Sequence, residues 1–367
     1  MFIHARHFAT GERLAVEIER ERIVSIAPAA GSAADLIAEW IAPSFFDIQV
    51  NGAHGISFTS PDLTVAEVQR VAQVVRSHGV GGFCPTVITA DFKTILHALR
   101  TLAAACAAHR GIEIAMPAFH LEGPYLSPDD GPRGAHPREP IRDPDWDEFQ
   151  RWQDAAEGRI RLVTLAPERP GALAMIERLT QVGVVAAIGH TAATAEQIRA
   201  AIAAGARIST HLGNGAHAVL PRHPNYIWEQ LAADELWASV IADGHHLSDC
   251  VLKCILRVKS PARTVLISDA SGLAGLAPGR YRLGNGEFDV LPEGKTVMAG
   301  TRLLAGAAVF LDACVDHVLG RGLASLPETV AMASSNPRRL LGLSPPTSAV
   351  IRTARGYLIV DCGEMWS

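Results

Sequence analysis

The sequence predicts an α/β fold, namely a (β/α)8 barrel of the TIM type with a small β-sandwich domain built from both chain ends. From Ile41 onward, short apolar runs alternate with helical patterns, which is typical of parallel α/β structure. Polar residues follow nearly every apolar run, as expected at the mouth of a barrel. A doubly wound sheet is the rival fold, but no Gly-x-Gly-x-x-Gly motif opens a helix after the first strand. The predicted barrel strands cover residues 45–50, 80–87, 113–121, 160–166, 184–189, 206–210, 237–242 and 263–268.

The amino-terminal segment has the pattern of a small antiparallel element. Leu14, Val16 and Ile18 alternate with polar residues, as expected of a strand with one buried face. A polar turn follows, and residues 23–26 resume an apolar strand. This pattern differs from the strand and helix alternation of the rest of the chain, so we expect a separate β element here.

The carboxyl-terminal segment is again strand-like. Residues 349–351 and 357–360 are apolar runs separated by a short polar stretch. We expect them to pair with the amino-terminal strands, so that both chain ends form one small β-sandwich. The predicted domains are therefore 1–42 and 347–367 for the two parts of the β-sandwich, and 43–346 for the barrel.

Helix signals lie between the predicted strands. Thr64 and Glu67 form a capping-box pattern, and apolar residues at helical spacing follow it. A second capping box at Thr194 opens an alanine-rich helix that we expect to end at Gly205. Residues 304–318 also keep helical spacing, which predicts a core-facing helix without catalytic residues.

The composition is that of a globular protein that acts on a small partner. With 367 residues, 48% hydrophobic content and a mean hydropathy of +0.16, the chain can bury one large core and a smaller one. A net charge of -5, without any long basic run, argues against nucleic acid or an anionic membrane surface as the main partner. The amino end lacks an apolar secretory stretch, and no run approaches a membrane span in length. We therefore expect a cytoplasmic protein with reduced cysteines.

Four polar residues stand at the ends of predicted strands, and they are Glu122, His190, His211 and Asp269. In a barrel of parallel strands, the carboxyl ends of all strands converge on one mouth, so residues far apart in sequence become neighbours. One carboxylate and two imidazoles make a catalytic zinc set, and a second carboxylate can serve as its base. The four positions together therefore predict a metal-dependent catalytic site.

Each of these residues also has a simpler interpretation. Glu122 would cap the turn that the following glycine and proline invite, and Asp269 would cap a turn or a helix. Two unrelated buried histidines are the simpler interpretation of the imidazole pair. The metal hypothesis is favoured because His190 and His211 end consecutive strands, and adjacent strands lie about 4.8 Å apart.

Three further polar residues close the first barrel strand. Period-two alternation points Asp47, Gln49 and Asn51 to the barrel interior. The same alternation places His120 one layer below Glu122, where we expect a hydrogen-bonding neighbour of the metal site or buried packing rather than a ligand. Gln49 and Asn51 are expected beside the metal site for the same reason.

Seven short sequence motifs resemble those of a known family. They are H-L-E-G-P at 120–124, G-P-R-G-A-H-P at 131–137, T-L-A-P-E at 164–168, I-G-H-T at 188–191, T-H-L-G-N at 210–214, A-D-G-H-H at 242–246 and S-D-A at 268–270. Together, in this order and spacing, they resemble the N-acetylglucosamine-6-phosphate deacetylases of the amidohydrolase superfamily. The resemblance runs from about Ala42 to Leu343, and the flanking β segments look like that family's small sandwich domain.

The resemblance implies roles for the strand-end residues. Glu122, His190 and His211 would be the metal ligands, and Asp269 would be the catalytic carboxylate that moves the proton. His136 would be a second catalytic residue, close to the reacting carbonyl. The expected reaction removes an acetyl group from N-acetylglucosamine 6-phosphate and gives glucosamine 6-phosphate and acetate.

The resemblance also implies residues that hold the substrate. Asn214, Gly215 and Arg222 match positions that the family uses on the sugar phosphate, and His246 would also contact the substrate. In this family the arginine often reaches the substrate of a neighbouring subunit, which implies a homodimer.

Two departures from the wider superfamily bear on the number of metal ions. Many amidohydrolases carry His-x-His after strand one and a lysine after strand four, whereas this chain has Gln49-Val50-Asn51 and a segment ending in Glu168. Without these ligands a second ion is not held, so we expect one divalent metal ion per chain, zinc. His54 is an alternative ligand, although its glycine-rich loop is typical of a surface histidine.

Two alternatives to this function stay open. One is an amidohydrolase that deacylates another N-acyl substrate, such as N-acetylgalactosamine 6-phosphate or an unphosphorylated compound. The other, more remote, is an inactive barrel that serves as a scaffold. The presence of all four strand-end residues argues against the scaffold.

Overall fold

Eight parallel strands form the predicted barrel in a computed structural model that describes residues 1–29, 33–284 and 286–363. In chain order they are β5 (Phe45–Val50), β8 (Val80–Ile88), β9 (Phe119–Glu122), β10 (Ile160–Leu165), β11 (Val185–Ile188), β12 (Ile208–Ser209), β13 (Trp237–Ile241) and β14 (Thr264–Ile267). Hydrogen bonds run through the sheet in the order β14-β13-β12-β11-β10-β9-β8-β5. A parallel bridge between Val50 and Ala270 brings the two edges together, so the barrel is nearly closed.

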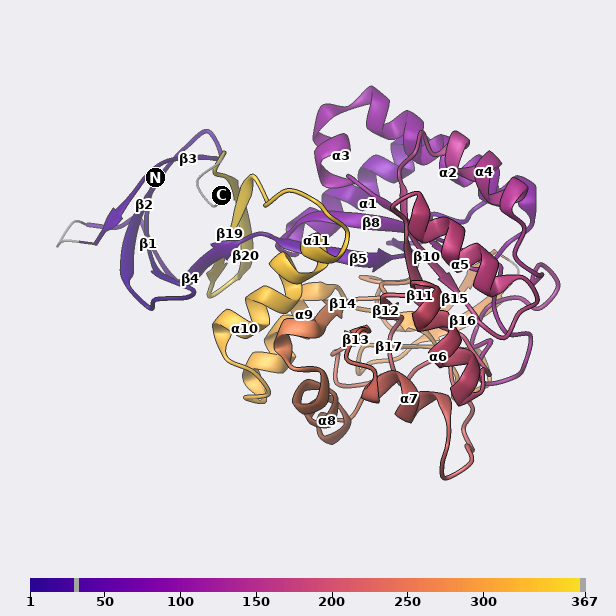
Figure 1. Cartoon of the computed structure of the whole chain (residues 1–367). Coiled ribbons are helices and arrows are strands. Elements are labelled where there is room, and N and C mark those ends of the chain that lie inside the picture. Colours follow the sequence, from indigo (N-terminus) through magenta and orange to yellow (C-terminus); the bar gives the residue numbers. More distant parts are fainter. Residues whose placement is uncertain (30–32, 285, 364–367) are drawn as a thin grey trace.

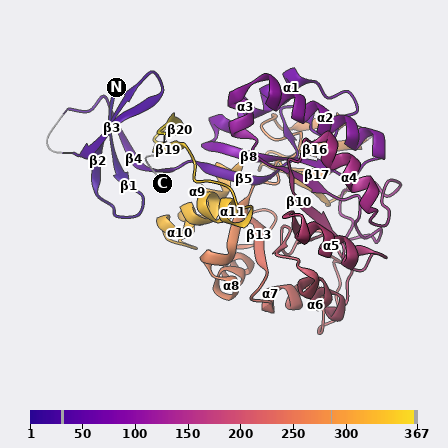
Figure 2. The same cartoon turned by 45° about the horizontal axis from the view of Figure 1, so that its top comes forward.

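Helices surround this barrel, as Figures 1 and 2 show. They are α1 (Val65–Ser77), α2 (Phe92–Ala108), α3 (Arg110–Ala115), α4 (Trp146–Ala155), α5 (Ala172–Gln181), α6 (Ala195–Ala204), α7 (Tyr226–Ala232), α8 (Asp249–Lys259), α9 (Leu311–Gly320), α10 (Leu326–Val330) and α11 (Asn336–Leu340). A 3-10 turn at Pro261–Arg263 precedes β14, and a π-helical turn at Ala331–Ser335 joins α10 to α11. Both predicted capping boxes are present, at Thr64 and Thr194, and Gly205 ends α6 in the left-handed conformation.

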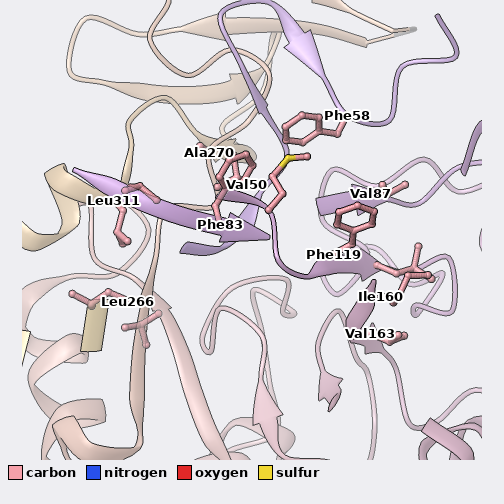
Figure 3. Close-up of a cluster of buried hydrophobic side chains, with 14 of the residues drawn as sticks. Val50, Phe58, Phe83, Val87, Phe119, Ile160, Val163, Leu266, Ala270 and Leu311 are labelled. Carbon is pink, nitrogen blue, oxygen red and sulfur yellow. The ribbon is translucent and has the colours of Figure 1, made fainter. Parts of the chain in front are cut away.

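The barrel strands are buried on both faces, because side chains fill the interior and helices cover the outside. Phe46, Ile48 and Leu162 belong to a cluster inside the barrel. The strict alternation expected along β5 therefore does not hold, and its register against β8 shifts between Asp47 and Val50. Outside the barrel, Phe83 and Phe119 belong to the large cluster that Figure 3 shows in part, between the strands and the helices. The strands are therefore fixed from both sides, which holds their carboxyl ends in place.

A second, smaller sheet joins the two chain ends. Its strands are β1 (Phe2–His7), β2 (Arg13–Glu19), β3 (Arg22–Pro28), β4 (Leu36–Pro43), β19 (Ser348–Thr353) and β20 (Gly356–Asp361). They close on themselves in the order β1-β2-β3-β20-β19-β4, around a core that includes Ile3, Val16 and Ile351. Figure 1 shows strands from the amino-terminal and the carboxyl-terminal part of the chain together in this sheet, so the predicted association of the two segments is confirmed.

The domain limits at 42 and 347 stay a prediction. Within the two terminal segments, residues 30–32 and 364–367 lie outside the described residues. Strand β4 continues to Pro43 and β19 begins at Ser348, so the chain passes from the small sheet to the barrel within a few residues of both limits.

A third sheet was not expected from the sequence. It is antiparallel and consists of β15 (Gly279–Leu283), β16 (Gly286–Val290), β17 (Lys295–Met298) and β18 (Leu304–Ala307). It lies between β14 and α9 in the chain, and a bridge from Ala307 to Ala270 joins it to the end of β14. A short hairpin of β6 (Gly52–Ala53) and β7 (Ile56–Ser57) follows β5.

Two predicted elements are wrong in part. The helix predicted from residue 304 begins only at Leu311, because residues 304–307 form β18 and their backbone pairs with β17 and with Ala270. The strand predicted over 113–121 is formed only from Phe119, since Arg110–Ala115 is helical. Ile114, the isoleucine of the predicted strand, does not lie on a buried face, because it is 53% exposed.

The helices give no indication of a membrane span. Over residues 1–29, 33–284 and 286–363, none of them is both long and apolar enough to cross a bilayer.

Candidate active site and metal centre

The four predicted site residues lie at the carboxyl ends of barrel strands. Glu122 is the last residue of β9, whereas His190, His211 and Asp269 follow β11, β12 and β14 by two residues. These three residues have φ angles of 50°, 31° and 51°, in the left-handed region that side chains other than glycine rarely adopt. Such a conformation costs on the order of 1–3 kcal/mol per residue, and it clusters at functional sites.

Glu122, His190 and His211 meet in a buried triangle of ligand atoms. Oε1 of Glu122 lies 3.2 Å from Nε2 of each histidine, and the two Nε2 atoms are 2.9 Å apart. Ligand atoms around a tetrahedral ion stand about 3.3 Å apart when each is about 2.0 Å from it. The three residues therefore have the spacing and the chemistry of a divalent metal site.

The protonation of these residues also fits a cation. Nδ1 of His190 donates to the carbonyl of Pro132 at 2.8 Å, so Nε2 is the ring nitrogen that faces the triangle. Burial would raise the pKa of Glu122, but the hydrogen bonds from His190 and His211 outweigh it and hold the pKa well below its usual range. The carboxylate is thus an anion between two imidazoles.

His136 lies beside this triangle. Its ligand atom and those of Glu122 and His190 all lie within 4.8 Å of one another, and its ring centroid is 4.3 Å from that of His190. Nδ1 of His136 is 2.9 Å from Oγ1 of Thr89, which directs the other ring nitrogen to the site. Burial lowers the pKa of His136 to about 3, so the ring is neutral at physiological pH.

Asp269 is held by two side-chain amides from the end of β5. Nδ2 of Asn51 donates to Oδ1 of Asp269 at 2.7 Å, and Nε2 of Gln49 donates to the same oxygen at 3.1 Å. Gln49 also donates to Oε1 of Glu122 at 3.0 Å. Burial, with the neighbouring Glu122 charge, raises the pKa of Asp269, which suits a group that must accept a proton and release it again.

His120 lies in a hydrogen-bonded layer beneath the triangle. Nδ1 is 3.3 Å from the hydroxyl of Thr86, and Nε2 is 2.8 Å from the hydroxyl of Thr164, which in turn contacts Thr210. Burial lowers the pKa of His120 to about 4. Both ring nitrogens of His120 are thus engaged by hydroxyl groups of the neighbouring strands.

A cavity of about 460 Å³ opens above the triangle. Its lining includes the four strand-end residues and His136, together with Asn214, Gly215 and His246. Nδ1 of His246 is 2.7 Å from Oδ2 of Asp243. At Gly215 a Cβ atom would stand only 2.8 Å from Nδ1 of His190, so this position needs glycine for close approach to the histidine.

Two other predicted residues do not reach this cavity within the chain. Arg222 is exposed in the loop between β12 and α7, and it is not part of the lining. His54 is also exposed and does not line the cavity, in agreement with its interpretation as a surface histidine.

Glu168, which was named from the sequence only because it stands where many amidohydrolases carry a lysine, has a structural role beside the site. Its carboxylate accepts hydrogen bonds from Oγ1 of Thr191 at 2.5 Å and from N of Ala192 at 2.6 Å. These two residues follow directly after His190, whose backbone is strained. Glu168 therefore holds the loop that positions His190, and its place after β10 was the available sequence signal.

The third sheet supplies a wall of the cavity that was also missed. Leu283, Phe288, Arg302 and Leu303 line the cavity together with the start of β18. The signal for this sheet was the turn sequence Pro292-Glu293-Gly294 between two apolar runs. The helical spacing of apolar residues from 304 onward favoured a helix instead of the last strand of this sheet.

Comparison with known proteins agrees with this geometry. The amidohydrolase family pattern matches residues 40–350. An N-acetylgalactosamine-6-phosphate deacetylase of Escherichia coli O157:H7 is 34% identical over 324 residues, which are 88% of this chain and 83% of the relative. An N-acetylglucosamine-6-phosphate deacetylase of Bos taurus is 35% identical over 316 residues, which are 83% of this chain and 75% of the relative.

A solved structure extends the likeness to the whole fold. An alanine variant of the N-acetyl-D-glucosamine-6-phosphate deacetylase of Mycobacterium smegmatis, in complex with N-acetyl-D-glucosamine-6-phosphate, matches with a TM-score of 0.84 at 33% identity. The match covers 96% of this chain and 95% of that chain. The family resemblance inferred from the seven sequence motifs is thus confirmed. The chain belongs to the amidohydrolase family, and it is a hydrolase that acts on an amide bond.

Proposed function

We propose that the protein removes the acetyl group from an N-acetylated amino sugar phosphate. The proposed substrate is N-acetylglucosamine 6-phosphate, which would give glucosamine 6-phosphate and acetate. The observation that carries this proposal is the convergence of the four strand-end residues at the base of one cavity. The relatives support the substrate class, because the Bos taurus protein is a deacetylase of this sugar phosphate and the Mycobacterium smegmatis protein was solved in complex with it.

The proposed cofactor is one divalent metal ion per chain, zinc, held by Glu122, His190 and His211. Such an ion supplies Lewis-acid chemistry, because it polarises an amide carbonyl and lowers the pKa of water to about 7. Gln49 supports the proposal of a single ion, since its amide donates hydrogen bonds to two carboxylates and offers no imidazole ligand. Glu168 stands where a bridging lysine would be needed, and it is engaged with Thr191 and Ala192.

The proposed proton path runs through Asp269. Its raised pKa suits a base that takes a proton from the attacking water and passes it to the departing amine, which is too basic to leave as an anion. Gln49 and Asn51 hold one oxygen of Asp269, so the other is left for the proton. His136 faces the same space, and sharing the negative charge that develops on the carbonyl oxygen is worth about 3 kcal/mol.

A panel of N-acetylated sugars tests the substrate. Acetate release should be fastest with N-acetylglucosamine 6-phosphate and slower with unphosphorylated N-acetylglucosamine. The second candidate is N-acetylgalactosamine 6-phosphate, which is favoured by the similarity to the Escherichia coli relative. A higher kcat/KM for the galactosamine compound would identify that epimer as the substrate. Equal rates for the phosphorylated and unphosphorylated sugars would show that the phosphate is not recognised.

Metal analysis of the purified chain tests the cofactor. We expect about one zinc per chain, and dialysis against a chelator should remove both the metal and the activity. Alanine at His211 should lower the metal content without unfolding the barrel. A metal content near two per chain would contradict the single-ion proposal.

We also propose a homodimer. Arg222 is exposed and away from the cavity of its own chain, which is compatible with an approach to the cavity of a second copy. Light scattering of the purified protein should give twice the mass of 39.1 kDa. A monomer at micromolar concentration would overturn this proposal.

A further inference from the structure

The charges around the cavity are unevenly distributed. Glu122 and Asp269 are the acidic residues of its lining, and both are buried at its base. Within the described part of the chain, Arg302 is the only arginine or lysine that lines the cavity. The cavity therefore has an acidic base and one cationic side chain in its wall.

Arg302 is exposed, and it is free to meet a ligand. Among the described residues, its guanidinium makes no ion pair or side-chain hydrogen bond. Arg280 on the same sheet, by contrast, is engaged, because it pairs with Asp289 at 2.8 Å. Arg133, close to His136, is bonded to Asp130 at 2.6 Å. An unpaired guanidinium at a cavity offers two parallel donors to a phosphate or carboxylate.

The turn that carries Arg302 is well defined. The backbone N of Met298 donates to the carbonyl of Leu303 at 2.9 Å, and N of Leu303 donates to Oγ1 of Thr301 at 3.1 Å. These two hydrogen bonds hold the turn between β17 and β18 in one conformation.

The strand that follows the turn is bonded to the catalytic segment. N of Ala307 in β18 donates to the carbonyl of Asp269 at 2.8 Å, and N of Ser271 donates to the carbonyl of Ala307 at 3.0 Å. Arg302 is therefore on a frame that is fixed relative to Asp269, which a residue that orients substrate requires.

We propose that Arg302 binds the anionic group of the substrate within the same chain. The inference rests on the proposed function and deepens it, because it assigns phosphate recognition to the β17–β18 turn. The substrate class is an N-acetylated amino sugar with a phosphate, whose amide lies at the acidic base and whose anion meets the guanidinium. Arg222, which lies outside the cavity of its own chain, is the competing residue for this role.

The experiment compares kcat/KM for N-acetylglucosamine 6-phosphate and for unphosphorylated N-acetylglucosamine in the full-length protein. The variants are Arg302→Ala, Arg302→Lys and Arg222→Ala. Arg282→Ala is the matched control, because Arg282 is an exposed arginine of β15 in the same sheet and does not line the cavity.

Arg302→Ala should lower kcat/KM for the phosphorylated sugar by roughly 10- to 100-fold, the effect of losing a hydrogen bond to a charged group. The unphosphorylated sugar should react within about twofold of the native rate, because it makes no such contact. Arg302→Lys should recover part of the loss, since it keeps the charge but not the two parallel donors. The Arg282→Ala protein should behave as the native protein with both sugars.

A binding measurement supports the kinetics. Inorganic phosphate should raise the thermal unfolding temperature of the native protein more than that of Arg302→Ala. Because Arg302 is exposed, both proteins should unfold at the same temperature without phosphate.

The outcomes separate this inference from the proposed function. If Arg302→Ala keeps the native preference for the phosphorylated sugar, or if Arg222→Ala alone removes that preference, the role of Arg302 is overturned while the deacetylase stands. If the native protein itself shows no preference, the phosphate part of the proposed function and the role of Arg302 both fall.

Discussion

At the scale of single residues, the site depends on which groups hold Asp269. Its Oδ1 receives the amide protons of Gln49 and Asn51, and the barrel keeps its backbone at a φ of 51°. The same Gln49 amide also donates to Glu122, so one side chain bridges the proposed base Asp269 and the proposed metal ligand Glu122. Two carboxylates can then lie in one buried site with different tasks, since their pKa values are shifted in opposite directions.

Asp269→Asn should retain the metal and lose about 10³-fold or more in turnover, because the amide has the shape of the carboxylate but cannot accept the proton. Steady-state acetate release and metal content of the same preparation provide the measurement. Near-native activity would remove Asp269 from the role of base, and a loss of metal would place it among the ligands.

A buried carboxyl below the site should make stability depend on pH. Burial raises the pKa of Asp47 from 3.8 to about 7, although hydrogen bonds from Ser268 and Gln49 lower it. Between these values the unfolded chain has lost a proton that the folded chain keeps. The free energy of unfolding therefore falls as pH rises from about 4 to about 7, and three pKa units correspond to roughly 4 kcal/mol.

Asp47→Asn should remove this contribution. Urea unfolding of both proteins at about pH 5 and about pH 8 gives the comparison, and the native protein should lose more stability than the variant between the two. The difference between the two proteins isolates Asp47 from other groups that titrate in both. Parallel pH profiles would show that Asp47 is ionised in the folded protein throughout this range.

At the scale of elements, β18 lies against the catalytic end of β14. A Cβ atom at Gly306 would stand 2.9 Å from the carbonyl oxygen of Asp269, and the residue has a φ of 65°. Gly300, in the turn before it, has a φ of 75° with nothing within 4 Å of such an atom. A side chain at Gly306 would therefore disturb both the contact with Asp269 and the backbone conformation. A side chain at Gly300 would disturb the backbone conformation alone.

Gly306→Ala should lower kcat at least about tenfold by displacing the backbone of Asp269, since misplacement by about 1 Å can cost 10²-fold. Gly300→Ala should lose only stability, by about 1 kcal/mol for the left-handed backbone. Acetate release and urea unfolding of both variants test this. Equal activity of the two variants would show that the contact of β18 with Asp269 does not matter for catalysis.

The helices and strands also show which parts of the fold local sequence patterns can predict. The eight barrel strands and both capping boxes were predictable, because each depends on a few neighbouring residues whose pattern follows from burial or from a local hydrogen bond. The sheet of β15–β18 was not, because its strands are half-exposed and have weak alternation. Residues 304–307 have helical spacing, yet pairing with β17 determines their structure.

At the scale of the whole molecule, Tyr357 connects the small sheet to the barrel. The ring of this β20 residue lies 5.8 Å from that of Trp40 and 5.4 Å from that of Phe45, the first residue of β5. Its hydroxyl donates to Oδ1 of Asp316 in α9 at 2.6 Å. Arg352 pairs with the same aspartate at 3.0 Å. The last strand of the chain is thereby fixed to the first barrel strand.

Tyr357→Phe should lower the free energy of unfolding by about 1–3 kcal/mol, because it leaves a half-buried carboxylate without one donor while the aromatic packing is kept. Tyr281→Phe is the control, since its hydroxyl bonds to the carbonyl of Ala277 at the surface, and it should change stability by less than about 0.5 kcal/mol. Urea unfolding provides the measurement. Equal stability of the two variants would show that the hydroxyl adds nothing to the junction.

The sequence by itself determined the barrel, the pairing of the chain ends and the convergence of Glu122, His190, His211 and Asp269. These follow from local burial patterns together with one geometric fact, that parallel barrel strands end at the same mouth. Only the tertiary structure decided which other residues reach that mouth. Arg222 lies outside it and Arg302 lies in its wall, because loop and hairpin positions depend on contacts distant in sequence, such as the bridge from Ala270 to Ala307.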